Sequence, residues 1–100
     1  MSDGGEVSDD ERLSERVERL HRELEATEEL PVDRTASRWI GEAQAVAADA
    51  ASGGLADDVV RERVGHVVEL LGHVESTGDE TADERVETAR ELAVDIADEE

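Results

Sequence analysis

The segment that most constrains the fold runs from Ala56 to Thr77, ADDVVRERVGHVVELLGHVEST, the most apolar long stretch of the chain. Its large apolar side chains recur at alternating spacings of four and three residues, which is the spacing of one stripe on a helix. The stripe consists of Val60, Val64, Val67, Leu71 and Val74, and it is widened by Val59, Val68 and Leu70. A stripe this broad predicts a helix over 56–77 that has neighbours on more than one side.

Three other segments carry the same spacing with smaller or fewer apolar residues. The first, about 9–29, has a narrow seam of Leu13, Val17, Leu20 and Leu24. The second, about 34–52, has a stripe that is almost all alanine: Ala36, Ile40, Ala43, Ala47 and Ala50. The last, about 80–97, has Ala82, Val86, Ala89, Ala93 and Ile96. The first seam is narrow enough for a single partner groove, which can lie within the chain or between two chains.

The predicted helices are separated by residues that end or start helices. Pro31 blocks continuation of the first, Gly53-Gly54 ends the second, and Gly78 ends the third. Connections this short make consecutive helices antiparallel neighbours. We therefore predict an all-α fold, a small antiparallel bundle of four helices about 9–29, 34–52, 56–77 and 80–97.

Local signals set the ends of this single domain, predicted over 8–97. Ser8 and Glu11 have the spacing of a capping box, and Asp33 is a candidate N-cap of the second helix. The last helix starts either with Asp79 as N-cap or with a second capping box, Thr81–Glu84. Residues 1–7 are acidic and lack periodicity, which predicts a disordered tail, and 98–100 are acidic at a helix C-terminus, which predicts fraying. Gly65 and Gly72 lie one heptad apart in the third helix, which indicates either a close backbone approach or an exposed face.

The charge of the chain is the second strong constraint. Asp and Glu number 29 against 10 basic residues, all arginine, for a formal net charge of -19. A dense carboxylate surface keeps a protein soluble where salt screens its self-repulsion. The composition resembles that of salt-adapted cytoplasmic proteins, and we predict halophilic adaptation and a cytoplasmic location.

The same composition argues against several functions. An acidic surface cannot neutralise phosphates, so nucleic acid and anionic membranes are not expected partners. The chain has no cysteine, which excludes disulfides and thiolate chemistry. It has no phosphate-binding loop, nucleophile elbow or calcium loop, and acid pairs such as Asp57-Asp58 sit at helix starts where capping explains them. We expect neither an enzyme nor a bound cofactor.

The metal-ligating residue types gather on one face of the third helix, as His66, Glu69 and His73. The two histidines are seven residues apart, about 10.5 Å along a helix axis, whereas a helical pair on one zinc is usually four apart. Glu69 and His73 alone supply two ligands, fewer than the four of a structural zinc site. We expect no metal site here, although these three residues are its candidates.

The most distinctive short stretch is Ser37–Glu42, which holds the only aromatic residue, Trp39, beside Arg38. Trp and Arg are common anchors of protein interfaces, so the pair can form a recognition patch. Alternatively, Trp39 is the one large residue of a core made of small side chains.

Protein–protein contact is the function that these observations favour, as an adaptor, an accessory subunit or a homodimer. The candidate interaction residues are Leu13, Val17, Leu20, Leu24, Arg38 and Trp39. The alternative is a bundle that binds a small molecule or a metal, which needs convergent polar groups in a pocket rather than an exposed apolar strip.

Overall fold

The computed structural model describes residues 9–98, and side chains from 12 onward. The four predicted helices are confirmed. They are α1 (Asp9–Glu25), extended by the short 3₁₀ helix η1 (Ala26–Glu29), then α2 (Arg34–Ala51), α3 (Asp57–Leu71) and α4 (Glu80–Asp98). The predicted tail at 1–7, the Ser8 end of the predicted capping box and residues 99–100 of the predicted frayed end lie outside the described residues.

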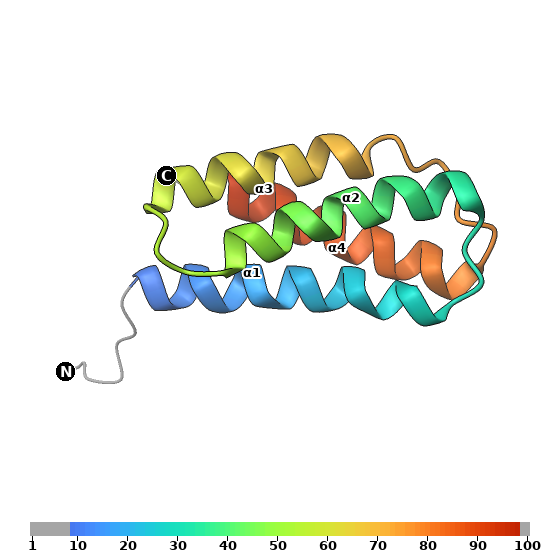
Figure 1. Ribbon diagram of the computed structural model, residues 1–100, viewed down its shortest axis with the longest axis horizontal. Helices are drawn as coiled ribbons and strands as arrows, with labels where there is room; N and C mark the ends of the chain where they lie inside the picture. The colour runs from blue at the N-terminus through green and yellow to red at the C-terminus, as the bar shows by residue number, and fades with distance from the viewer. Residues whose placement is uncertain (1–8, 99–100) are drawn as a thin grey trace.

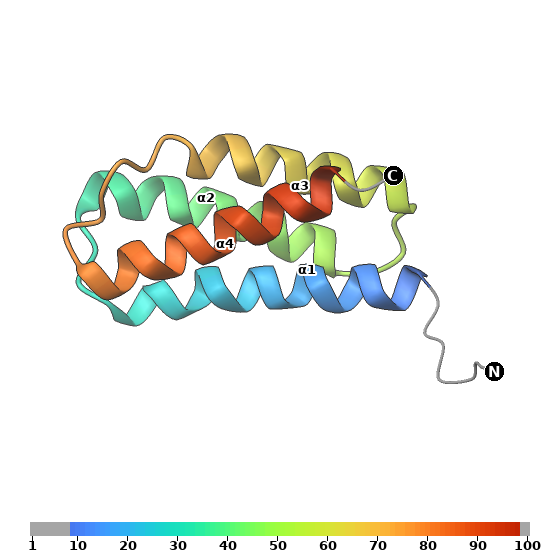
Figure 2. The same ribbon diagram turned by 180° about the vertical axis from the view of Figure 1, so that it is seen from behind.

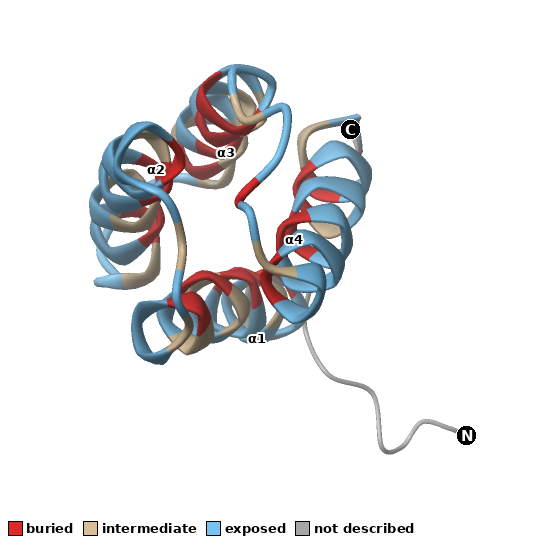
Figure 3. Ribbon diagram, turned by 90° about the vertical axis from the view of Figure 1, so that its right-hand side faces the viewer, coloured by how far each residue is buried: buried red, intermediate tan, exposed pale blue. Residues whose placement is uncertain are grey.

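The helices form an up-and-down bundle in which each contacts two neighbours (Figure 1). α1 packs beside α2 and α4, and α3 packs beside α2 and α4, so that α1 and α3 face each other diagonally. Seen along the bundle, the buried residues line the inside of this square (Figure 3). No helix within 9–98 is long and apolar enough to cross a membrane.

The core contains the stripes that the sequence predicts. All five stripe residues are buried on α2 and on α4, as are the first four on α3. The seam of α1 is the most completely enclosed, with Val17, Leu20 and Leu24 at 0% exposure and Leu13 at 4%. Because the other helices contribute mainly Ala and Val, these leucines supply much of the core volume. The sequence left open whether this seam packs within the chain or between two chains, and in the structure it packs within the chain.

One predicted boundary is wrong. The third helix ends at Leu71, not at Thr77, and Val74 packs against the core from the connection that follows. The cause is Thr77, which is fully buried and accepts a hydrogen bond at its carbonyl oxygen from the backbone N–H of Asp33, 2.8 Å away. If the helix continued to residue 77, that carbonyl would point along the helix axis and could not reach Asp33. The irregular connection after α3 lets Thr77 reach the start of α2.

Both candidate N-caps are confirmed by hydrogen bonds. An Asp33 carboxylate oxygen accepts from the Ala36 N–H at 2.8 Å, and an Asp79 carboxylate oxygen accepts from the Ala82 N–H at 2.9 Å. At the other end of α2, Gly53 has a φ of 88°, a left-handed conformation that a side chain disfavours. These caps fix where α2 and α4 begin and where the chain leaves α2.

The close backbone approach considered for Gly65 and Gly72 does not occur. A Cβ at Gly65 would meet nothing within 4 Å, and the atoms nearest to one at Gly72 belong to the backbone of Glu69 and Val68, in the last turn of α3 itself. Gly65 therefore faces open space, and Gly72 lies where α3 ends.

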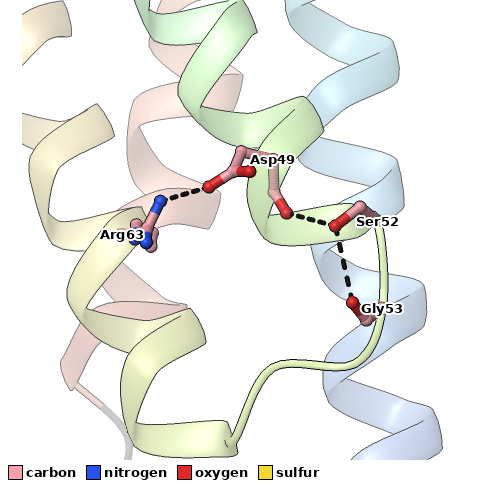
Figure 4. Close-up of polar contacts among 4 residues, drawn as sticks. All are labelled: Asp49, Ser52, Gly53 and Arg63. Carbon is pink, nitrogen blue, oxygen red and sulfur yellow. Dashed lines mark hydrogen bonds and ion pairs between the residues drawn. The ribbon is translucent and has the colours of Figure 1, made fainter.

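An ion pair between Asp49 and Arg63 ties the end of α2 to α3 (Figure 4). In the same turn the Ser52 hydroxyl donates to the Asp49 carbonyl oxygen at 2.7 Å, closing the last turn of α2 before the glycines. Both charged side chains are about half exposed, at 46% and 52%, so the pair is expected to contribute only about 0.2–1 kcal/mol.

Candidate interaction surface

The candidate interaction residues fall into two groups in the structure. The α1 seam lies in the bundle interior and is closed to any partner of the folded chain. Arg38 and Trp39 lie on α2, where Arg38 is exposed and Trp39 is partly buried. Only the second group is thus on the surface.

Trp39 is both a packing residue and a surface residue. Its indole packs against the core cluster and stacks on the His73 imidazole, with ring centroids 4.2 Å apart and planes inclined by 14°. The Arg38 guanidinium lies 6.0 Å from the Trp39 ring centroid, at the outer limit of a cation–π contact. The ring therefore covers the junction between α2 and the connection after α3.

The three candidate metal ligands do not form a site. Among the described side chains, 12–98, no group of three or more His, Asp or Glu is placed to hold a metal ion. His73 lies beyond the end of α3, and its ring is stacked on Trp39. His66 and Glu69 are exposed on α3 itself. The early end of α3 thus removes the helical register on which this candidate depended.

A groove lies along α4 on the side of the connection 72–79. α4 runs obliquely, from the level of α1 at its start toward the level of α3 at its end (Figures 2 and 3). The far wall of the groove is therefore formed by the end of α3 and the connection rather than by a full helix. Its apolar lining is Leu71, Val74, Val86 and Val94, and its charged lining is Glu75, Asp83, Glu87, Arg90, Glu91 and Asp95.

Val94 is the outstanding apolar residue of this groove. Among residues 12–98 it is the one large hydrophobic side chain that is exposed, at 36%. A single exposed valine is ordinary on a protein surface. Here, however, it lies in a groove that also exposes part of Val74, so the groove exposes apolar surface from both of its walls.

A row of carboxylates follows the same side of α4, at Asp83, Glu87, Glu91 and Asp95. A spacing of four residues places them one turn apart on one face. Apart from Asp83, the carboxylates of this row make no hydrogen bond or ion pair with any described side chain. The groove thus combines exposed apolar surface with a row of carboxylates available to a partner.

The remaining carboxylate, Asp83, fixes the wall of the groove. One of its oxygens accepts hydrogen bonds from the Thr77 N–H and from the Thr77 hydroxyl, each at 2.8 Å. These bonds, the backbone one first, lower the pKa of the Asp83 carboxyl below its ordinary value of 3.8. The Thr77 carbonyl oxygen also accepts a hydrogen bond from the Asp33 N–H at the start of α2. Hydrogen bonds therefore connect the segment that carries Val74 and Glu75 to both α2 and α4.

Sequence reasoning did not find this groove. The regular spacing of the carboxylates is visible in the sequence, and Val94 lies off the α4 stripe. In a chain with 29 acids, however, such spacing carries little information by itself. The groove depends on the oblique course of α4 and on the early end of α3.

Comparison with known protein families matches residues 16–100 to a domain of unknown function, DUF8152. No curated protein and no solved structure matches the chain. The match covers every helix of the bundle except the first turns of α1.

Proposed function

The chain belongs to the DUF8152 family of domains of unknown function, and we propose that it acts by binding a protein partner. Its role is that of an adaptor or accessory subunit in the cytoplasm of a salt-adapted cell. The observation that carries the proposal is the exposure of Val94 in the groove along α4. Exposed apolar strips with a polar rim are typical of protein contact sites.

The structure of the core supports this role in a second way. The bundle encloses its whole leucine seam, so the apolar exposure that remains at the groove is not part of the core and is available for recognition. The groove is open and rimmed by charge along its length, unlike the mostly apolar enclosed pockets that bury small molecules. A protein segment suits such a surface better than a small ligand does.

Copurification from a salt-adapted host at molar KCl tests the proposal. Tagged wild-type chain is compared with Val94→Gln, which removes the apolar anchor without adding charge. The matched control is Thr88→Gln, because Thr88 is an exposed β-branched residue of α4 that does not line the groove. A partner retained by wild type and by Thr88→Gln but lost by Val94→Gln supports the proposal. Retention by all three, or by none, contradicts it.

A further inference from the structure

We infer that the segment held in the α4 groove is an amphipathic helix of the partner protein, with apolar residues on one face and arginines on its flanks. This inference rests on the proposed function and specifies its ligand. It follows from three observations. They are the length of the groove, the placement of charge along it, and the acidic composition of the rest of the chain.

The length of the groove suits a helix. Its lining on α4 extends from Asp83 to Asp95, twelve residues apart, which corresponds to about 18 Å along a helix axis. A helix laid beside α4 would match this length with about three turns. Val74 and Val94 would then contact apolar side chains on one face of that helix, as in other complexes that place a helix in a groove.

The charge of the groove selects a basic segment. Its lining contains five carboxylates and one guanidinium, that of Arg90. The carboxylates at Glu87, Glu91 and Asp95 repeat every turn and are unpaired within the described chain. Basic residues four apart on a neighbouring helix repeat with the same period, so that each could pair with one carboxylate.

The same charge argues against the other available occupants. A second copy of this chain has 29 acidic against 10 basic residues, so most of its surface would bring carboxylates to the carboxylate row. The segment before α1 carries Asp3 and Glu6 and no basic side chain, and the chain ends in Glu99 and Glu100. None of these sequences complements the row on α4.

Arginine is favoured over lysine in the partner because of salt. At about 1 M salt the Debye length is about 3 Å, so only charges in direct contact contribute appreciably. A guanidinium is weakly hydrated and can bind a carboxylate through two parallel hydrogen bonds, whereas an ammonium acts as a hydrated point charge. The preference therefore arises from contact geometry rather than from long-range attraction.

A fluorescently labelled synthetic helix with a leucine face and arginine flanks tests the inference by polarisation at molar KCl. Otherwise identical peptides carry glutamine or glutamate in place of arginine. The expected order of affinity is arginine, then glutamine, then glutamate. The double variant Glu87→Arg/Glu91→Arg should weaken the arginine peptide about tenfold. The matched control Glu62→Arg/Glu69→Arg changes net charge equally on exposed sites of α3, outside the groove, and should have less than about a twofold effect.

Three results would overturn the inference, and they differ in what they imply for the proposed function. If the glutamine peptide binds as tightly as the arginine peptide and both are lost in Val94→Gln, the groove binds protein without selecting charge, and the proposed function stands. If the arginine peptide binds Val94→Gln and the α3 control variant like wild type, its attraction is to the acidic surface in general. If no peptide binds and no partner depends on Val94 in copurification, the proposed function fails as well.

Discussion

The indole of Trp39 lies against the imidazole of His73, with ring centroids 4.2 Å apart and an inclination of 14°. This stack joins α2 to the connection that follows α3, and Thr77 joins the same connection to α2 and α4 through hydrogen bonds. The wall of the groove is thus held at two points. The part of the wall that belongs to no helix is therefore still anchored to α2 and α4.

Removing the stack should loosen this connection. His73→Ala should lower the free energy of unfolding by about 0.5–1.5 kcal/mol, the range for an aromatic pair, and shift Trp39 fluorescence to longer wavelength as the indole becomes more exposed. Fluorescence spectra and thermal melts at molar KCl measure both effects. His66→Ala, at an exposed histidine without a ring contact in the structure, is the control and should change neither. Equal spectra in all three proteins would show that the stack does not shield Trp39.

The Asp83 carboxylate should make part of the stability depend on acid pH. Its pKa in the folded chain lies below the ordinary value of 3.8 because the Thr77 N–H and hydroxyl donate to it. This contribution is therefore complete above the unfolded pKa and is lost as the pH falls through the lower folded pKa. In Asp83→Asn the stability should change less over that acid range than in wild type.

The variant Thr77→Val separates the two hydrogen bonds, because it removes the hydroxyl and retains the N–H, which is the larger cause of the shift. The Asp83 pKa measured by NMR should rise part of the way toward its ordinary value. A wild-type value at or above 3.8 would contradict the hydrogen-bond arrangement.

The enclosed seam of α1 should govern folding rather than association. Leu20→Ala should cost about 3–5 kcal/mol, as for other buried leucines, because Leu20 is fully enclosed. Leu92→Ala, at the partly buried edge of α4, should cost about 1 kcal/mol. Denaturant melts measure both values, and sedimentation of wild type at molar KCl should give the 10.9 kDa monomer. A dimer that Leu20→Ala dissociates without unfolding would show that the seam lies between chains.

The carboxylate row on α4 should make stability depend on salt. At about 0.1 M salt Glu87→Gln/Glu91→Gln should raise the free energy of unfolding by roughly 0.6–1.5 kcal/mol. The double variant removes all three repulsive i,i+4 pairs of carboxylates in the row, which are 83–87, 87–91 and 91–95. The gain should disappear at about 1 M salt, where screening limits the repulsion between charges to a range of about 3 Å. Glu62→Gln/Glu69→Gln, which neutralises as much charge on α3, should gain less. Wild type that is equally helical and equally stable at low and molar salt would refute salt adaptation.

The sequence was sufficient to predict the four helices because each carries a strong apolar period and is bounded by a proline, a glycine or a capping carboxylate. The buried positions on α2 and α4 follow directly from that period. The end of α3 could not be predicted in this way. The period continues to Val74, while the chain leaves the helix at Leu71 because Thr77 pairs with Asp33 and Asp83, which are distant in sequence.

The candidate site depends even more on such long-range contacts. The helical face proposed for His66, Glu69 and His73 requires a helix that continues past Leu71, and it is lost where α3 ends. The groove along α4 exists because its far wall is formed by the end of α3 and the connection after it, and not by a full helix. Local periodicity contains no information on the course of α4 across the bundle.

NMR mapping of the arginine peptide on the isotope-labelled chain at molar KCl tests most directly whether the α4 groove is the protein-binding surface. We expect the amide shifts to change in a saturable way along α4 and the facing connection, with the largest changes at Val74, Glu87, Glu91 and Val94. We expect no change around Ala45 and Ala48, which are exposed on α2 and do not line the groove. Small, non-saturating changes at carboxylates over the whole surface would contradict the claim.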